Sequence, residues 1–490
     1  MEQPEPQVPH VVFFPFPAHG HIKPMFRLAE LLSHANFQVT FLNTQRNHDL
    51  LLLSSDIPAF RSRYPNFQLL SYPDKVPLGL DPHRRSEQGF VDLLLSTKAA
   101  AKPALSELLE KKTGRRPPTC IIADWAIMCS SAMDVAKEFG NIPVFAFQTA
   151  CAHYMWMDFH LLKLIEEGEV PLRGYKDMDK PVTSISGLGM SVRRRDLSGF
   201  ARFDTVCKQV IEISTNYGSS AVSQAYGVIH NTFDKLEAPV ISKLSSFLPF
   251  KIYTIGPLHC LLNNYCIKDS NPLHSINVTI CKEDTNCITW LDSQPSGSVI
   301  FVSFGSLVSL SRSQILEIGQ GLLNSCRPFL WVILPNPIVG QQEDDSTPGQ
   351  ILMELENMSK EKGLIVSWAP QEKVLAHPAI GGFLTHSGWN STMESIYARV
   401  PMICWPTEAD QLVNSRCVSE LWRIGFDMKD TCDRSTVEKL VNDLMEDKRD
   451  EIMKSMDKIT RQAEESVQEG GSSYCNLQRL ITDIRSLIPT

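Results

Sequence analysis

Residues 298–333 read SVIFVSFGSLVSLSRSQILEIGQGLLNSCRPFLWVI and indicate how the second half of the chain folds. Apolar residues dominate positions 298–304, which predicts a short buried strand followed by the loop GSLVSLS. Hydrophobic residues then recur at helical spacing over 312–323, and a second apolar strand is expected at 329–333. A strand, a loop, a helix and a strand in this order form the building block of a parallel sheet covered by helices.

The same plan occurs near the amino terminus. A strand is expected at residues 11–15, and the loop AHGHIKP follows it. A helix over 25–34 then leads into a second strand at 38–42. Two such units far apart in the chain predict two separate sheets.

Further units follow in each half. They are a strand at 121–123, a helix at 127–139 and a strand at 144–147, then strands at 364–367, 382–385 and 402–405. Between the halves, over residues 258–286, the periodicity fades into Asn, Ser, Pro and Cys, which is typical of a linker. The sequence therefore predicts an α/β fold with two tandem Rossmann-like domains, whose ligands bind in a cleft at the carboxyl ends of the strands.

These patterns predict the domain boundaries. The 490 residues are too many for one compact core and suit two domains. We expect a first domain over 1–257, a linker over 258–286 and a second domain over 287–470. Residues 471–490 have an amphipathic helical pattern, and we expect this last helix to pack back on the first domain.

Composition excludes several classes of protein. The net charge of −8 gives no overall basic field for duplex nucleic acid, so we expect no nucleic-acid partner. Thirteen cysteines without a repeated spacing predict reduced thiols in a cytoplasmic protein. No basic leader precedes the first apolar run, and no stretch is long enough for a membrane span, so neither a secretory signal nor a span is expected. We also expect a monomer.

The densest group of polar and aromatic residues lies in WAPQEKVLAHPAIGGFLTHSGWNSTMESIYARVPMICWPTEADQ, residues 368–411. Within it, HSGWNS predicts a turn from a buried strand into a helix. Gly388 allows close approach of a ligand to the backbone, and Asn390 and Ser391 bring N–H groups and polar side chains to the helix start. A helix amino terminus suits a diphosphate, and His386 could donate to a phosphate oxygen.

Two further side chains fit a nucleotide. Glu394 lies one turn into this helix, where its carboxylate could accept from two ribose hydroxyls, and Trp368 could stack on a flat base. Structural alternatives exist, because Ser391 and Glu394 also fit a helix capping box and Trp368 and Trp389 could be core aromatics. The combination of His, Asn, Ser and Glu at one helix start favours a binding site, since core packing alone does not require it.

The first half offers a base. The loop AHGHIKP carries His19 and His21, and a histidine that titrates near pH 7 can remove a hydroxyl proton. Asp124 ends the predicted strand IIAD. It could cap the next helix, or it could orient a histidine and stabilise the imidazolium, as the third member of a catalytic triad does. A histidine satisfied within the loop is the structural alternative.

Residues 368–411 closely resemble the signature box of the plant UDP-dependent glycosyltransferases, family 1 enzymes of secondary metabolism, and have the same length of 44 residues. The segments ITWLDSQPSGSVIFVSFGS, VIHNTFDKLE, YTIGPL and EGGSSYCNL also match the family, so the resemblance covers nearly the whole chain. It implies the GT-B fold, with two Rossmann-like domains facing a cleft, and an enzyme that transfers a hexose from a UDP-sugar.

The resemblance assigns twelve contacts with the UDP-sugar. They are Trp368 and Gln371 for uracil, Glu394 for ribose, His386, Asn390 and Ser391 for the diphosphate, Asp410 and Gln411 for the sugar, and Ser306, Ala369, Gly388 and Trp389 around them. A terminal Gln such as Gln411 usually accompanies glucose donors, so UDP-glucose is the expected donor. The chain departs from the family at Thr407 and Glu408, where relatives commonly have a small apolar residue and an aromatic one.

The family's Gly-His-x-x-Pro pattern matches His21 and Pro24, so the resemblance implies that His21 is the base and Asp124 its partner. The implied reaction is one in-line displacement at the sugar C1, which inverts that centre and gives a β-glucoside or a glucose ester. We expect no cofactor and no metal, because helix-end N–H groups and His386 stabilise the leaving UDP. The DxD string of Asp177 and Asp179 resembles a metal motif of another glycosyltransferase fold, but it lacks the strand context and predicts a solvated loop.

Acceptor contacts are expected from the first domain, with Trp125, Phe147 and Gln148 as candidates. The segment HYMWMDFH, 153–160, fits either a helix core or a pocket, and RRRDL, 193–197, fits either a solvated loop or a surface facing an anionic acceptor.

Segments within residues 166–202 look most like the branch that glucosylates terpenoids, including iridoid acids of the 7-deoxyloganetic acid type. The expected acceptor is therefore a small lipophilic terpenoid, with a flavonoid or phenolic acceptor as the alternative.

Other functions lack their motifs. A nicotinamide dehydrogenase requires GxGxxG after the first strand, and this chain has AHGHIKP there. An α/β-hydrolase requires GxSxG, which does not occur. A non-catalytic UDP-sugar-binding protein stays open.

Overall fold

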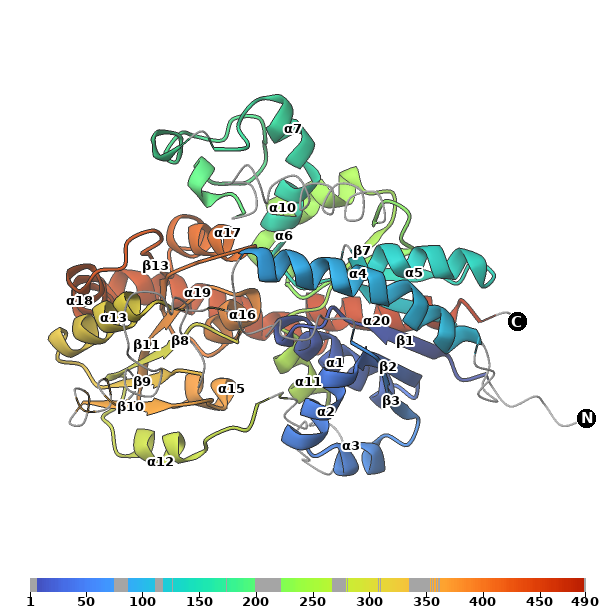
Figure 1. The fold of residues 1–490 in the computed structure, drawn as a ribbon, viewed down its shortest axis with the longest axis horizontal. Coiled ribbons are helices and arrows are strands. Elements are labelled where there is room, and N and C mark those ends of the chain that lie inside the picture. The colour runs from blue at the N-terminus through green and yellow to red at the C-terminus, as the bar shows by residue number, and fades with distance from the viewer. Residues whose placement is uncertain are drawn as a thin grey trace, which may run out of the picture.

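The chain forms two parallel sheets, which lie side by side in Figure 1. The computed structural model describes residues 7–74, 87–110, 118–125, 127–172, 174–198, 222–266, 279, 281–306, 308, 310–334, 353, 355, 357, 359 and 362–488. The first sheet consists of β1 (His10–Phe14), β2 (Gln38–Thr44), β3 (Phe67–Tyr72), β4 (Cys120–Asp124), β5 (Val144–Gln148), β6 (Gly227–His230) and β7 (Lys251–Thr254). The second consists of β8 (Val299–Ser303), β9 (Phe329–Val332), β10 (Gly363–Val366), β11 (Ile380–Thr385), β12 (Met402–Cys404) and β13 (Gly425–Asp427).

Strand order confirms the predicted fold class of two Rossmann-like units. The first sheet has the order β3-β2-β1-β4-β5-β6-β7, and the second has β10-β9-β8-β11-β12-β13. The side of the sheet on which successive strands are added changes between β1 and β4 in one unit and between β8 and β11 in the other, while all strands stay parallel. Ligands of such sheets bind at the carboxyl ends of the strands beside this reversal.

Helices cover both faces of the first sheet, because alternate residues of its strands face opposite sides. Val11 and Phe13 of β1 pack with α1 (His19–His34), α11 (Leu258–Cys266) and α20 (Ser472–Arg485), whereas Val12 and Phe14 pack with α4 (Glu87–Glu110), α5 (Ile127–Glu138) and α10 (Asp234–Phe247). The remaining helices of this half are α2 (Gln45–Ser54), α3 (Ile57–Arg63), α6 (Ala152–Phe159) and α7 (Leu161–Glu166).

The second sheet is covered in the same way. Its helices are α12 (Asn286–Asp292), α13 (Arg312–Asn324), α15 (Gln371–Leu375), α16 (Trp389–Tyr397), α17 (Gln411–Arg416), α18 (Arg434–Asn442) and α19 (Arg449–Val467). Helices α13 and α18 contribute to the core on one face, and α16 and α19 to the core on the other.

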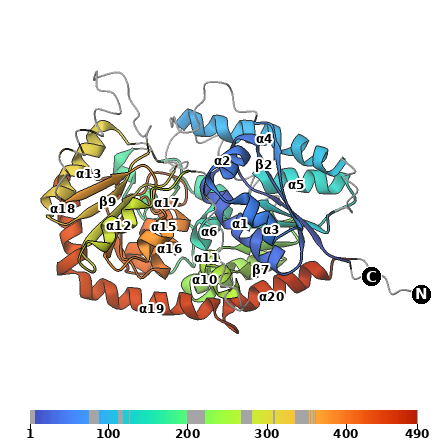
Figure 2. The same ribbon diagram turned by 90° about the horizontal axis from the view of Figure 1, so that it is seen from below.

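The last two helices join the halves. In Figure 2, α19 and α20 run beneath both sheets, and α20 contacts β7 of the first sheet. Leu477, Leu480, Ile481 and Ile484 of α20 are buried in the same core as β1. The domain boundaries, including the expected role of the terminal helix, stay predictions.

Two expected loops are helical. Helix α1 begins at His19 rather than near residue 25, and Ile22 N–H donates to the carbonyl of Ala18 at its start. Pro24, the last residue of the expected loop AHGHIKP, lies inside α1. Residues Leu258–Cys266, expected to begin the linker, form α11, whose Leu258 and Leu261 are buried against the first sheet.

Every cysteine whose side chain the structure describes is free. Among the described residues, no helix has both the length and the apolar character that crossing a membrane requires.

Candidate functional site

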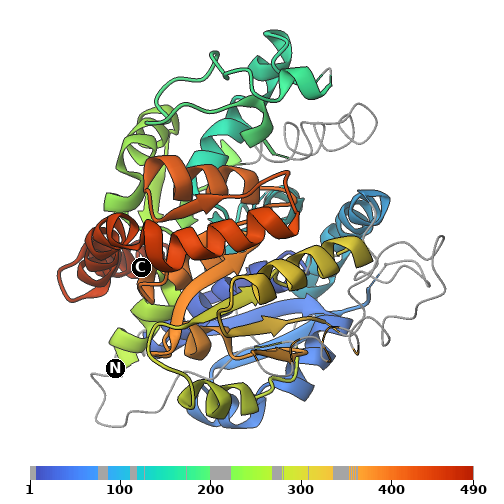
Figure 3. The same cartoon turned by 90° about the vertical axis from the view of Figure 1, so that its left-hand side faces the viewer.

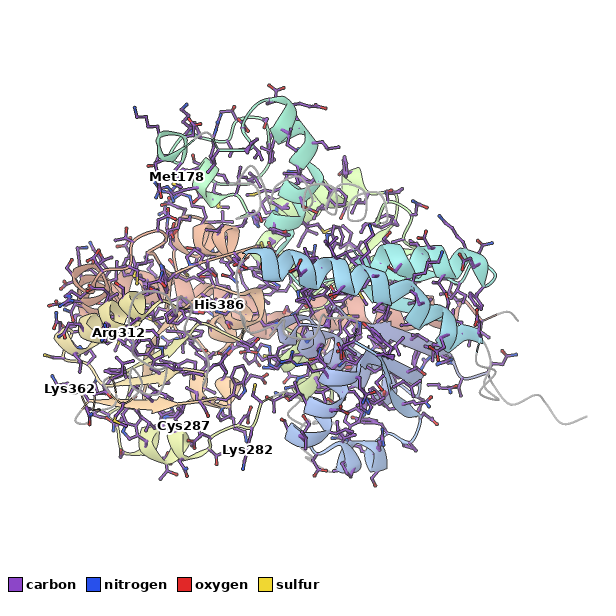
Figure 4. The ribbon with its side chains drawn as sticks, in the orientation of Figure 1. Met178, Lys282, Cys287, Arg312, Lys362 and His386 are labelled. Atoms are coloured by element: carbon purple, nitrogen blue, oxygen red, sulfur yellow. The ribbon has the colours of Figure 1, made fainter. Side chains whose placement is uncertain are left out.

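A cleft of about 330 Å³ lies where the carboxyl ends of the two sheets meet. Residues after β1, β4, β8 and β11 line it, and His386, which follows β11, lies between the two halves of the molecule (Figure 4). All predicted UDP-sugar residues, both predicted catalytic residues and two of the three acceptor candidates line the cleft. The fold therefore gathers side chains that are hundreds of residues apart in the sequence.

Asp124 holds His21 in the first-half wall. The His21 Nδ1 lies 2.9 Å from Asp124 Oδ2, and the Asp124 side chain is only 1% exposed. The same carboxylate accepts hydrogen bonds from the backbone N–H groups of Phe16 at 3.1 Å and Trp125 at 2.8 Å. These donors follow β1 and β4, so the carboxylate is fixed at the ends of two neighbouring strands. With Nδ1 bound to the carboxylate, Nε2 is the nitrogen free for a substrate proton.

The pKa values of the two histidines at the start of α1 are shifted in opposite directions. Burial alone would lower the pKa of His21, but the Asp124 carboxylate outweighs it and raises that pKa above its usual value. Burial and the nearby Lys23 ammonium lower the pKa of His19 to about 3. The His19 ring lies edge-on to Trp368, with centroids 5.7 Å apart. His19 is thus a neutral neighbour of Trp368, the residue predicted to cover the uracil. His21 has the features of a proton acceptor.

Two glycines make room for the His386 ring. A Cβ on Gly305 would lie 2.7 Å from the ring, and one on Gly388 would lie 2.5 Å from its Nε2. Gly305 also has a φ of +71°, which disfavours other residues. These glycines come from the loops after β8 and β11, so the imidazole is fixed between the two strand ends at the reversal point.

Helix α16 begins at Trp389, with Gly388 as its N-cap. The capping box proposed for Ser391 and Glu394 is therefore wrong. Instead, Gln371 Nε2 donates to Ser391 Oγ at 3.0 Å and to Glu394 Oε2 at 2.7 Å. The polar side chains of this helix form a cluster with α15 that faces the cleft.

Asn390 reaches across the cleft. Its Nδ2 donates to the Gly20 carbonyl of α1 at 2.6 Å. In a helix this carbonyl would accept from the N–H four residues later, but that residue is Pro24, which has none. The proline thus leaves a backbone acceptor that the second half of the chain uses.

The two tryptophans of the motif differ. Trp368 is half-buried and lines the cleft, and its role as the cover of a base stays a prediction. Trp389 is 3% exposed, its Nε1 donates to the Asn231 carbonyl at 2.7 Å, and its ring centroid lies 6.2 Å from that of Trp422. Its indole packs between the halves, so the core alternative describes Trp389.

Gln411 is oriented by the two residues that depart from the family pattern. Its Oε1 accepts from the backbone N–H and Oγ1 of Thr407, both at 3.0 Å, and from the N–H of Glu408 at 3.2 Å. The amide NH₂ is the group left for a sugar hydroxyl. The neighbouring Asp410 accepts from Asn414 Nδ2 at 2.7 Å, and burial raises the pKa of Asp410 to about 6.

The acceptor candidates divide. Trp125 and Gln148 line the cleft, but Phe147 is fully buried in the core beneath it, because adjacent residues of β5 face opposite sides of the sheet. The segment 153–160 is mostly α6, and it serves both purposes. Its buried residues pack in the core, while Tyr154 and Asp158, one turn apart, line the cleft.

Residues 193–197 have neither expected role. The Arg193 guanidinium pairs with Asp196 at 3.0 Å and with Asp427 of β13 at 3.3 Å. Asp196 is fully buried and also pairs with Lys429. Figure 3 shows the green segment that contains α7 lying over the orange helices of the second half. The run is an ion-paired contact between the halves and does not line the cleft.

The DxD string is not assembled as a metal site. Asp177 pairs with Lys180 at 2.6 Å, and Asp179 pairs with Arg195 at 2.8 Å. Within the described parts of the chain, no group of three or more His, Cys, Asp or Glu side chains could hold a metal ion.

The cleft also contains residues that were not among the predicted site residues, although Tyr154 and Asp158 lie in a segment for which a pocket was one alternative. Lys23, Tyr154, Asp158 and Thr407 line it, and Lys23 contacts Glu394 from the other half. The helical spacing of Tyr154 and Asp158 within 153–160 was a usable signal. Nothing local in the sequence indicates the partner of Lys23.

Comparisons with known proteins agree with this geometry. The model of the UDP-glucoronosyl and UDP-glucosyl transferase family matches residues 98–461. The chain is 44% identical to 7-deoxyloganetic acid glucosyltransferase of Catharanthus roseus, over 98% of each chain. It is 43% identical to myricetin 3-O-rhamnoside 1,2-glucosyltransferase of Crocosmia x crocosmiiflora, over 98% of this chain and 96% of the relative. The structure of Medicago truncatula UGT71G1 complexed with UDP-glucose superimposes with a TM-score of 0.75 at 28% identity, over 98% of both chains.

Proposed function

The chain belongs to the UDP-glucoronosyl and UDP-glucosyl transferase family, and from that premise we propose how its cleft transfers glucose and to which acceptor. It is a UDP-glucose-dependent glycosyltransferase of plant secondary metabolism, with the GT-B fold. The proposed reaction moves glucose from UDP-glucose to a hydroxyl or carboxyl group of a small lipophilic terpenoid, with inversion at C1.

The His21–Asp124 pair supports the catalytic step. The acceptor O–H donates its proton to His21 Nε2 as the acceptor oxygen attacks the glucose C1. The bond from C1 to the phosphate oxygen breaks on the opposite side, and UDP leaves with the electron pair. Asp124, 2.9 Å from Nδ1, stabilises the imidazolium that forms. A β-glucoside results.

The start of α16 supports the donor site. Its free N–H groups and the His386 ring bind the diphosphate and stabilise the charge on departing UDP. Trp368 covers the uracil, and Glu394 accepts from the ribose hydroxyls. Asp410 and the Gln411 amide bind the glucose hydroxyls.

The acceptor assignment draws on the relatives. One relative is named for 7-deoxyloganetic acid, and another at 38% identity, of Gardenia jasminoides, is named for 7-deoxyloganetin. We propose an iridoid or related terpenoid, bound between Trp125, Gln148, Tyr154 and Asp158. A flavonoid acceptor is the second candidate, because the Crocosmia relative is named for a myricetin glycoside.

We further propose a monomeric cytosolic enzyme that requires no metal. Free cysteines support a reducing compartment, and the helix-end donors with His386 supply the charge stabilisation that a metal would otherwise give. Activity that survives treatment with EDTA and dialysis would support the absence of a metal requirement. Loss of activity that Mg²⁺ or Mn²⁺ restores would contradict it.

The test is an acceptor screen with UDP-glucose that measures released UDP, product mass and linkage. UDP release with the wild type but not with His21→Ala supports the proposed mechanism. Tight UDP binding without turnover on any acceptor would instead identify a binding protein. A carboxylic acid has little proton to remove, so His21→Ala should cost less with an acid acceptor than with an alcohol. Equal losses on both would contradict the role of His21 as a base.

A further inference from the structure

Lys23 joins the two walls of the cleft at the predicted ribose site. Its Nζ lies 2.8 Å from Glu394 Oε1 and 2.6 Å from Glu372 Oε1. Lys23 comes from α1 in the first half, and both carboxylates come from the second half. The contact is enclosed, because only 15% of the Lys23 side chain and 4% of the Glu394 side chain are exposed.

The Glu394 carboxylate can accept further hydrogen bonds beyond those that it makes in the structure. Gln371 Nε2 donates to Oε2 at 2.7 Å, and Lys23 donates to Oε1. An ionised carboxylate has about four acceptor positions, two on each oxygen. One position therefore stays available on each oxygen. The vicinal 2′- and 3′-hydroxyls of a ribose supply two donors, which matches this remainder.

The Lys23 ammonium also balances the charge of the Glu372 and Glu394 carboxylates. Burial alone would lower its pKa, but Glu372 and Glu394 outweigh burial and raise that pKa, so the ammonium stays charged at neutral pH. A buried carboxylate without a nearby cation is costly and takes up a new partner or a new position. Glu372 has a second cation, since Arg27 Nη2 lies 3.3 Å from its Oε1. Loss of Lys23 therefore affects Glu394 more than it affects Glu372.

We propose that Lys23 is a positioning residue of the donor site, which holds the Glu394 carboxylate in the orientation that accepts hydrogen bonds from both ribose hydroxyls of UDP-glucose. The inference rests on the proposed ribose contact of Glu394. Lys23 itself touches no part of the donor in this scheme. The first half of the chain thus helps to set donor affinity, although the donor residues lie in the second half.

A purely structural role is the competing account. If Lys23 only fastens the two halves together, its loss weakens every nucleotide to the same extent. If it positions Glu394, its loss weakens only nucleotides that carry the ribose hydroxyls. The two accounts are separated by comparing UDP with 2′,3′-dideoxyuridine 5′-diphosphate.

The experiment is calorimetric titration of the full chain with each nucleotide. In the wild type, removal of the two hydroxyls should weaken binding by about 10-fold or more, since hydrogen bonds to a charged group are strong. Lys23→Met should bind UDP about 10-fold more weakly and the dideoxy nucleotide almost as the wild type does. Lys23→Arg keeps the charge and should retain most of the preference. Lys23→Gln replaces Lys23→Met if the latter does not fold.

Arg27→Met is the matched control. Arg27 also reaches from α1 to Glu372, with its Nη2 3.3 Å from Glu372 Oε1. This variant should melt at a lower temperature but keep the wild-type preference for UDP. Steady-state kinetics should agree, with the KM of UDP-glucose raised in Lys23→Met and the KM of the acceptor unchanged.

The outcomes are distinguishable. A wild type that prefers UDP, together with a Lys23→Met variant that keeps the same preference, overturns this inference and leaves the proposed function intact. Equal weakening of both nucleotides in Lys23→Met also overturns it, in favour of the structural account. A wild type that does not bind UDP overturns the proposed donor site and this inference with it.

Discussion

The side-chain amide of Asn390 donates to the Gly20 carbonyl across the cleft at 2.6 Å, and Pro24 is the reason that this carbonyl is available. The contact fixes a residue proposed to bind diphosphate. It also gives the proline of the Gly-His-x-x-Pro pattern a physical purpose, because a proline four residues after the glycine removes the competing helical donor.

Pro24→Ala should therefore weaken the donor site. The new N–H donates to Gly20 in place of Asn390, which frees the amide to move. We expect the KM of UDP-glucose to rise about 5- to 10-fold, the loss of one hydrogen bond, without a fall in melting temperature. Pro103→Ala, which removes the proline inside α4, is the control and should leave the KM unchanged. A donor KM that stays at the wild-type value in both variants would refute the role of Pro24.

His21→Ala should lower kcat by about 10²- to 10⁴-fold, the usual contribution of a general base. The base must be neutral, and the pKa of His21 is raised above 6.5, so the wild-type rate should rise with pH through a midpoint above 6.5.

Asp124→Asn removes the charge that raises this pKa and leaves the lowering effect of burial. The rising limb should then move to lower pH, while kcat falls. His19→Ala should leave the limb in place, because burial and the nearby Lys23 lower the pKa of His19 to about 3. The check is a pH–rate profile of the wild type, Asp124→Asn and His19→Ala. A rising limb that shifts in His19→Ala but not in Asp124→Asn would show that His19, not His21, is the base.

Gly305→Ala should impair donor binding, since its Cβ would lie 2.7 Å from the His386 ring. Gly140 also has a positive φ, +95°, but nothing lies within 4 Å of a Cβ placed there. Both changes should cost about 1 kcal/mol of stability from backbone strain. Only Gly305→Ala should weaken UDP binding measured by tryptophan fluorescence. Equal UDP affinities in the two variants would show that the ring position is unimportant.

Gln411 should set the sugar preference. We expect the wild type to prefer UDP-glucose to UDP-galactose in direct competition. Gln411→Ala should lower kcat/KM for UDP-glucose about 10-fold and narrow that preference, because a hydrogen bond to the sugar is lost. Thr407→Val removes only one of the groups that orient Gln411 and should have a smaller effect. A wild type that prefers galactose would contradict the assignment.

Asp196→Asn should destabilise the protein by about 3 kcal/mol, since it breaks a buried ion pair with Lys429. Arg195→Ala removes more exposed pairs and should cost about 1 kcal/mol or less. Burial would raise the pKa of Asp196, but Lys429 and Arg193 outweigh it and lower that pKa. The stabilisation is therefore present above about pH 4 and is lost as the pH falls through the folded pKa. Urea unfolding should give stabilities of wild type and Asp196→Asn that converge in acid.

Local patterns predicted much of the molecule. Apolar strands, the turn HSGWNS and the strand-ending Asp124 are each readable within a few residues, because the sheet alternation and the loop chemistry are local. The two sheets and part of the cleft followed from them, whereas Gln371, Asp410 and Gln411 were assigned through the resemblance to the family.

Other features depend on partners that no local pattern contains. Lys23 and Glu394 are 371 positions apart, and the helical start of α1 is completed by Asn390 from the other half. The arginines of 193–197 resemble a solvated run until β13 supplies Asp427. Phe147 was misassigned because one step along a strand changes the face on which a side chain lies.

Helix α20 fills the core of the first sheet with residues from the far end of the chain. During synthesis the ribosome therefore releases the first sheet with part of its apolar surface uncovered, and that surface is closed only when the last helix emerges. A nascent chain that stops before Leu477 lacks this cover, and we expect its exposed apolar surface to bind chaperones.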